Sequence, residues 1–166
     1  MEFTSDVILR GEYWSKAIND LKPLFEPRAN YSIFMLSLAI GIMYDQRIER
    51  SDETNEDSRT VPRNVLTNND NGKLDFFFQA AILSTTTVNL TEDERLDLAF
   101  GEGTSFNKLG MLTEFANFGV TKLVEQIGET EIESMEKIKN FLVSTVEGRN
   151  FDIDSIPDDI LISEME

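Results

Sequence analysis

The sequence predicts an all-α protein: a compact bundle of about five to six helices with one long polar loop near residues 51–72. Apolar residues follow a three-four spacing over long stretches, which is the period of one helix face. Two capping boxes, Thr91–Glu94 and Thr130–Glu133, mark helix starts. A chain of 166 residues that is 40% hydrophobic is also long enough to build one core. We therefore expect a single helical domain over residues 1–148, followed by an acidic tail over 149–166.

The first elements expected are a short strand over residues 6–10 and a helix over about 12–25. The stretch "DVILR" is compatible with a strand. Pro23 falls in the last turn of the helix, and Pro27 closes it. One face of this helix carries apolar residues at spacings of four, three and four, namely Trp14, Ile18, Leu21 and Phe25.

Residues 30–50, "NYSIFMLSLAIGIMYDQRIER", predict the central helix of the bundle. Asn30 is a suitable N-cap for it. The apolar run over 33–44 is about 12 residues long, whereas a membrane-spanning helix needs about 20, so a buried core helix fits better. Its charged end carries Arg47 and Arg50, which we expect within reach of solvent or of a partner.

The polar residues 51–72 predict a long surface loop. A calcium-binding EF-hand does not fit there. With Gly72 at the sixth position of such a loop, Thr67 and Phe78 would occupy the first and twelfth positions, which require carboxylate ligands. Helical character returns in the following "KLDFFFQAAIL". The stretch "STTTV" at 84–88 then ends that helix, because β-branched residues disfavour helix.

A short helix is expected over about 92–100, after the capping box that begins at Thr91. Four acids cluster on it, and carboxylates of this kind can bind a divalent cation. Acids are also favoured in the first turn of a helix by the helix dipole, and we adopt this second interpretation and predict no metal site. The four acids are Glu92, Asp93, Glu94 and Asp97.

Residues 106–128, "FNKLGMLTEFANFGVTKLVEQIG", predict the clearest helix of the chain, with Gly128 as its stop. Asn117 lies inside this apolar stretch, where a polar residue either fixes the packing or faces a partner. Gly41 and Gly119 each cost about 1 kcal/mol in a helix interior relative to alanine. We therefore expect these two glycines to mark a close approach of two helices.

The second capping box opens a last helix, which Gly148 ends. The turn between this helix and the one before it is short, so the two are expected to pack antiparallel. The face expected to be buried carries Ile132, Met135, Ile138, Leu142 and Val146.

The net charge of −16, from 31 acids and 15 bases, argues against direct contacts with nucleic-acid phosphates and with an anionic membrane. Residues 1–66 hold 11 acids and 8 bases, a net of −3, whereas residues 67–166 hold 20 and 7, a net of −13. An excess of acids of this kind is typical of a solvated surface. It also fits a docking face for a basic partner, or a DNA mimic.

The tail alternates isoleucines with acids, and either folds back on the domain or is offered to a partner as a linear segment. Its aspartates complete the set of residues that we predict to make interactions: Asn117, Arg47, Arg50, Asp152, Asp154, Asp158 and Asp159.

The residue types that most often carry out catalysis are missing. Without histidine or cysteine the chain lacks the commonest general base, the commonest transition-metal ligand and the thiol nucleophile. No Walker A loop, nucleophile elbow or dinucleotide-binding turn occurs, and "GEGTS" at 101–105 lacks the lysine of a phosphate loop. We therefore predict no enzyme activity and assign no catalytic, cofactor-binding or metal-binding residue. The lack of cysteine and of a signal-peptide pattern favours the cytoplasm.

Several segments, in this order, resemble the small Dnd system-associated proteins, which are encoded beside bacterial DNA phosphorothioation genes. The segments are "FMLSLAIGIMYDQR", "VPRN", "DFFFQAAIL", "LTEDE" and "LTEFANFGVTKLVEQI". A family segment that carries Glu-Tyr-Ala-Asn is matched by Glu114–Val120 and by Leu123, although Phe115 stands where the family tends to have tyrosine. The resemblance covers about residues 20–128. It implies a place in a phage-defence or DNA-modification locus, and it implies no enzymatic activity or catalytic residues.

These observations lead to one principal hypothesis and several alternatives. The principal one is a non-enzymatic accessory or regulatory protein of a bacterial defence system, which contacts a larger protein of that system, one with a basic surface. The alternatives are an acidic DNA-mimic inhibitor or immunity-type antitoxin, and a hydrolase that uses carboxylates and Mg²⁺. The order of a strand and two helices over 6–46 also resembles that of a ribbon-helix-helix regulator, but the net charge opposes DNA binding. Oligomerisation is left open.

Overall fold

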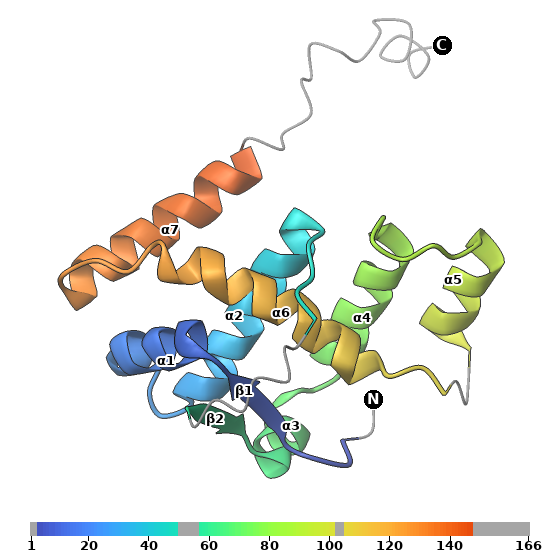
Figure 1. The fold of residues 1–166 in the computed structure, drawn as a ribbon, viewed down its shortest axis with the longest axis horizontal. Helices are drawn as coiled ribbons and strands as arrows, with labels where there is room; N and C mark the ends of the chain where they lie inside the picture. The colour runs from blue at the N-terminus through green and yellow to red at the C-terminus, as the bar shows by residue number, and fades with distance from the viewer. Residues whose placement is uncertain (1–2, 50–56, 102–104, 148–166) are drawn as a thin grey trace, which may run out of the picture.

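Two helices, α2 (Ala29–Tyr44) and α6 (Lys108–Val124), cross at the centre of the fold (Figure 1). The computed structural model describes residues 3–49, 57–101 and 105–147. Over these residues it contains seven helices and one two-stranded sheet, so the predicted all-α class is confirmed. The other elements are β1 (Val7–Arg10), α1 (Glu12–Phe25), β2 (Ser58–Val61), α3 (Arg63–Asn69), α4 (Lys73–Ser84), α5 (Glu92–Phe100) and α7 (Glu131–Glu147).

The crossing of α2 and α6 depends on the two glycines that the sequence singled out. A Cβ atom on Gly119 would overlap the carbonyl oxygen of Ser37 and would lie 2.9 Å from the backbone nitrogen of Gly41. A Cβ atom on Gly41 would overlap the carbonyl oxygen of Phe115. The two backbones therefore touch, and the predicted close approach is confirmed.

The expected strand near residues 6–10 is confirmed as β1, but the prediction of a loop over 51–72 is wrong in its second half. β2 pairs antiparallel with β1, with Val7 opposite Val61 and Arg10 opposite Ser58. α3 follows directly after Pro62. Val61 and Leu66 are fully buried, so this stretch is anchored in the core through its few apolar residues.

Asn30 is not the N-cap of the central helix, which begins one residue earlier, at Ala29. The amide of Asn30 donates instead to the carbonyl of Thr60 at 2.8 Å. This bond ties the first turn of α2 to β2, so a side chain expected to serve its own helix serves a tertiary contact.

α1 follows its prediction closely. It runs over residues 12–25 with Pro23 inside its last turns, and Trp14, Ile18 and Leu21 are buried. The ring of Trp14 lies 6.5 Å from that of Phe34 on α2, centroid to centroid.

The end of α6 and the start of α7 differ from the prediction. α6 ends at Val124, and the amide of Gly128 donates to the hydroxyl of Ser134 rather than closing the helix. The second capping box is half formed. Thr130 accepts from the amide of Glu133, but the carboxylate of Glu133 accepts from the amide of Glu129.

The predicted buried face of α7 is only partly buried. Ile138 is in the core, but 67% of Ile132 and 54% of Met135 are exposed. α7 lies at the edge of the molecule (Figure 1). The helix that it contacts most is α1 rather than α6. The ring of Phe141 also stacks on that of Tyr44. Because α7 is contacted along one side only, Ile132 and Met135 are left facing water.

No helix in the described ranges is long and apolar enough to cross a membrane. The predicted acidic tail, 149–166, and the end of the last helix at Gly148 lie outside the described residues.

Candidate functional site

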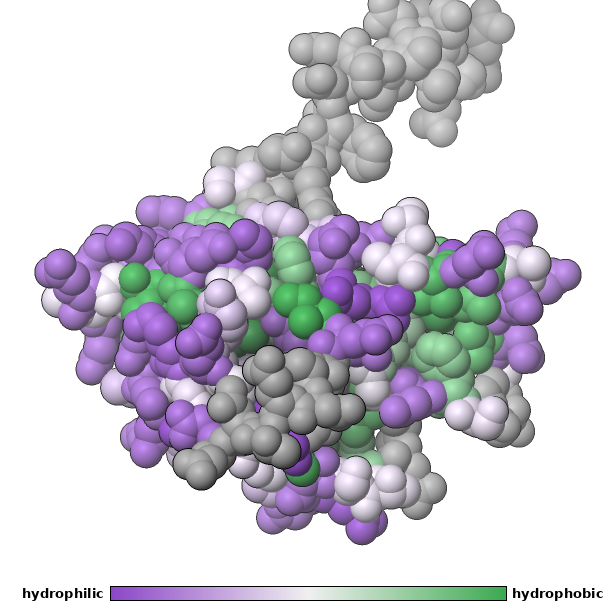
Figure 2. All heavy atoms as spheres, in the orientation of Figure 1, coloured by the Kyte–Doolittle hydropathy of each residue, from purple (hydrophilic) through white to green (hydrophobic). Residues whose placement is uncertain are grey.

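The α4–α5 face is the exposed surface defined by Phe76 and Leu83 on α4 and by Leu96 and Phe100 on α5. These four large apolar side chains are 68%, 41%, 45% and 63% exposed, respectively. α4 and α5 pack against each other at the edge of the fold opposite α7 (Figure 1). Figure 2 shows apolar residues gathered over the region where these two helices lie. Exposed apolar residues gathered in one region mark interaction sites more often than scattered single residues do.

α4 is apolar on nearly all sides, and its part of the face is the apolar side that the fold leaves unburied. Leu74, Phe78 and Ile82 point into the core. Phe76 and Leu83 are seven residues apart, so they lie two turns apart on the same outer side of the helix. Among the ring pairs of the described residues, Phe76 appears only with its neighbour Phe77, in an edge-to-face arrangement with the centroids 6.2 Å apart. The sequence of α4 therefore supplies more apolar surface than the fold buries.

The start of α4 is fixed by a buried carboxylate. Asp70 is 4% exposed, and it accepts hydrogen bonds from the amides of Gly72 at 3.1 Å and of Leu74 at 2.8 Å. These bonds satisfy amides at the beginning of the helix that have no partner within it. The direction in which Phe76 points is thus set by a capped helix and not by a loop.

α5 adds negative charge beside its apolar pair. Leu96 and Phe100 are one turn apart, and Glu92, Asp93 and Asp97 are all exposed on the same short helix. The helix also carries a single base, Arg95. The guanidinium of Arg95 donates to the carbonyls of Ile82 at 2.7 Å and Val88 at 2.8 Å, so it points inward and fastens α5 to the end of α4.

The first capping box is present as predicted. Thr91 accepts from the amide of Glu94, and the carboxylate of Glu94 accepts from the amide and hydroxyl of Thr91. The hydrogen bonds from the backbone and the side chain of Thr91 outweigh a small desolvation effect and lower the pKa of Glu94. The helix start explains the first-turn acids, but it does not explain why Leu96 and Phe100 face water.

Asn117, one of the predicted interaction residues, is engaged within the fold. Its side-chain oxygen accepts from the indole Nε1 of Trp14 at 2.9 Å, and its amide nitrogen donates to the carbonyl of Ile48 at 3.3 Å. Of the two roles considered for this residue, the contacts support fixing the packing, because Asn117 joins α6 to α1 and to the segment after α2. A role toward a partner stays a prediction.

Replacing Asn117 with alanine is expected to lower the free energy of unfolding by about 1–2 kcal/mol, because the buried indole N–H of Trp14 loses its acceptor. Trp14→Phe removes the donor itself. The double variant should therefore cost less than the sum of the two single variants, with a coupling of about 1 kcal/mol. Urea unfolding followed by circular dichroism measures all four proteins. Strictly additive costs would show that the bond contributes nothing.

Arg47 is also held within the fold. Its guanidinium donates to the carboxylate of Glu114 at 2.8 Å and to the hydroxyl of Thr87 at 2.8 Å, and it lies over the ring of Phe115. It therefore links the end of α2 to α6 and to the segment after α4. The other predicted interaction residues lie outside the described residues: Arg50, Asp152, Asp154, Asp158 and Asp159.

Asp45 forms a second link at the same place, and sequence reasoning missed it. This residue ends α2 in the left-handed conformation, with φ of 49°. Its carboxylate accepts from the hydroxyl of Thr85, and from the amide and hydroxyl of Thr86 at 2.8 and 2.7 Å. Burial tends to raise the pKa of Asp45, but these hydrogen bonds and the nearby charge of Arg47 outweigh it, and the pKa is lowered. The stretch "STTTV" thus ends α4 and also binds the end of α2.

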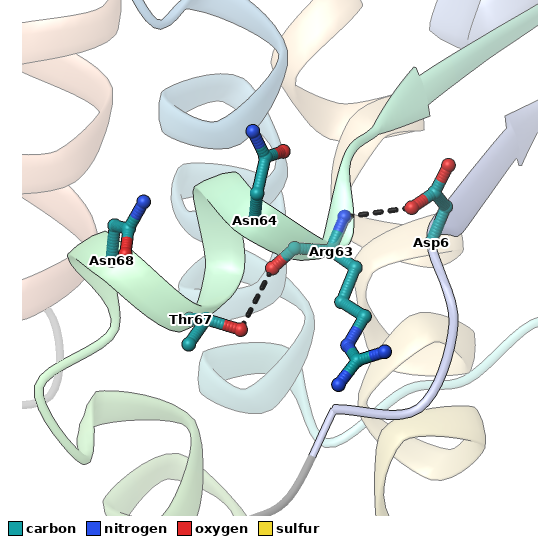
Figure 3. A pocket seen from close by; sticks show the side chains of 5 residues that line it. All are labelled: Asp6, Arg63, Asn64, Thr67 and Asn68. Atoms are coloured by element: carbon teal, nitrogen blue, oxygen red, sulfur yellow. Dashed lines mark hydrogen bonds between the residues drawn. The ribbon is translucent and has the colours of Figure 1, made fainter.

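A shallow hollow of about 490 Å³ lies between the start of β1 and α3 (Figure 3). The carboxylate of Asp6 accepts from the backbone N–H of Arg63 at 2.7 Å, and the hydroxyl of Thr67 donates to the carbonyl of Arg63 at 3.0 Å. The side chains of Asn64 and Asn68 point away from that of Arg63, so the polar groups do not converge on one point. The arrangement fastens α3 to β1 and offers no focused binding site.

Among the described residues, no group of three or more acidic side chains is placed to hold a metal ion. No protein-family model, curated protein or solved structure matches the chain.

Proposed function

We propose that this protein is a non-enzymatic accessory or regulatory protein, and that it acts by binding another protein through the α4–α5 face. The single observation that carries the proposal is the exposure of Phe76, Leu83, Leu96 and Phe100 on two helices that pack side by side. Full burial of a side chain of this size yields about 1.5–3 kcal/mol. Burying the exposed 68% of Phe76 and 63% of Phe100 against a partner would therefore yield about 1–2 kcal/mol each, and the less exposed leucines would yield about 1 kcal/mol each.

The resemblance to the Dnd system-associated proteins supports a setting for this function. In that setting the chain would work in the bacterial cytoplasm and would contact a larger protein of a DNA-modification or phage-defence locus. The quoted segments "DFFFQAAIL" and "LTEDE" overlap α4 and the start of α5, so part of the resemblance falls on the helices that carry the face.

The proposal predicts that the full tagged chain, expressed in its native host with the rest of its locus, retains a specific larger protein. Replacing Phe76 and Phe100 with serine should reduce the amount retained by roughly fivefold or more, because two interface anchors are lost. The measurement is affinity purification with quantitative mass spectrometry.

The matched control replaces Ile132 and Val143 on α7, which are similarly exposed at 67% and 45%, with serine, and it should retain the partner fully. Recovery of free protein alone from all three strains would contradict the proposal. The proposal would also be contradicted if added duplex DNA displaced the retained protein and neither pair of substitutions changed the amount retained. That result would favour an acidic DNA mimic.

A further inference from the structure

We infer that the occupant of the α4–α5 face is a basic amphipathic helix of the partner. This inference rests on the proposed function and adds the chemistry of the partner. It follows from two properties of the face, the spacing of its apolar side chains and the negative charge beside them. The same charge also disfavours the other candidate occupants.

The spacing of the apolar residues fits a helix. Phe76 and Leu83 are seven residues apart on α4, a rise of about 10 Å, and Leu96 and Phe100 are four apart on α5, a rise of about 6 Å. A partner helix presents its own apolar side chains at the same one-turn and two-turn intervals. The rows of side chains on such a helix can pack against the rows of side chains on α4 and α5.

The charge on α5, beside Leu96 and Phe100, selects a basic partner. Glu92, Asp93 and Asp97 surround Leu96 and Phe100 in sequence and are exposed. The only base on α5, Arg95, is turned inward to two backbone carbonyls and neutralises little of the outer surface. A helix with lysine or arginine beside its apolar stripe would thus find both apolar and charge complementarity.

The same charges disfavour the other occupants. A second copy of this chain would bring a second net charge of −16 and the same carboxylates to the contact. The C-terminal residues 148–166 carry six acids and one base, so they too would be repelled. An anionic membrane surface is opposed for the same reason.

The probe for this inference is a synthetic, fluorescein-labelled peptide of about 18 residues, with leucine on one helical face and lysine on the other. Titration with the full chain, followed by fluorescence anisotropy, should show binding that weakens with added salt. A peptide with glutamate in place of lysine should bind at least roughly tenfold more weakly, and so should a scrambled peptide of the same composition that lacks the apolar face.

Variants separate the face from general attraction to an acidic protein. Phe76→Ser with Phe100→Ser leaves the charge unchanged and should weaken binding of the lysine peptide roughly tenfold. Asp93→Asn with Asp97→Asn should weaken it and also reduce its salt dependence. Ile132→Ser with Val143→Ser on α7 should have no effect. Thermal unfolding followed by circular dichroism checks that each variant is folded.

Binding of the lysine peptide that is insensitive to the Phe76 and Phe100 substitutions would overturn the inference, since it would reflect net charge alone. Equal binding of the lysine and glutamate peptides would overturn it as well. If the lysine peptide fails to bind while the cellular partner still depends on Phe76 and Phe100, the partner chemistry is wrong and the proposed function stands. If the peptide binds as expected but no partner is retained in cells, the proposed function fails instead.

Discussion

Gly119→Ala is expected to lower the free energy of unfolding by about 3 kcal/mol or more, although alanine is the better helix former. Helix propensity alone favours the substitution by about 1 kcal/mol. The new Cβ, however, would overlap the carbonyl oxygen of Ser37 on α2, which is backbone and cannot rotate away. Relief requires α2 and α6 to separate along the closest helix contact of the fold. Domains typically have a free energy of unfolding of about 5–15 kcal/mol, so a loss of about 3 kcal/mol would remove a large fraction of the stability.

Gly110→Ala is the matched control, because it is the same substitution in the same helix. There the added Cβ meets the side chain of Asn107, a flexible cap that can turn aside. The loss of that cap costs about 1 kcal/mol, and the gain in helix propensity offsets about as much. Urea unfolding should therefore leave this variant within about 1 kcal/mol of the wild type. Equal stabilities for the Gly119 and Gly110 variants would show that the helices can separate at little cost.

The parts of the fold that could be predicted from sequence are those fixed by local chemistry. The capping box at Thr91 and the prolines near Phe25 define helix ends without reference to the rest of the chain. The glycine pair was predictable for a related reason. Gly41 and Gly119 are unfavourable in a helix on local grounds, so their presence indicates a tertiary cause.

The parts that could not be predicted depend on contacts between distant residues. β2 contains only one fully buried apolar residue, Val61. The strand forms because its backbone pairs with that of β1, which lies some fifty residues earlier in the chain. From the sequence around them, Asn30 is expected to be a helix cap and Arg47 a free cation. Each is instead engaged by a partner far along the chain, Thr60 and Glu114.

The candidate site was hidden by the composition of its own helix. The stretch "KLDFFFQAAIL" is apolar in nearly every direction, so periodicity does not show that Phe76 and Leu83 face outward. The residues that were predicted to interact are the polar and charged ones. Two of them, Asn117 and Arg47, instead join α6 to α1 and to the end of α2 within the fold.

The link between Asp45, at the end of α2, and the segment after α4 should depend on pH. Asp45→Ala is expected to lower the free energy of unfolding by about 2–3 kcal/mol at neutral pH. The substitution removes hydrogen bonds to an ionised group, and it places alanine in the left-handed region that Asp45 occupies with φ of 49°. Asp45→Asn tolerates that conformation and keeps an acceptor, so it should cost only about 1 kcal/mol.

The pH dependence of this difference follows from the direction of the pKa shift. The pKa of Asp45 in the folded protein lies below the usual value of 3.8, so the unfolded chain binds the proton first as the pH falls. Its contribution is complete well above pH 3.8 and is lost as the pH falls through the lower, folded-state pKa. The stability gap between the wild type and Asp45→Asn, measured by urea unfolding from pH 7 downward, should accordingly narrow on the acid side. A gap that stays constant down to acid unfolding would show that the charge of Asp45 makes no contribution, and that the hydrogen bonds of Thr85 and Thr86 are equally strong with a neutral acceptor.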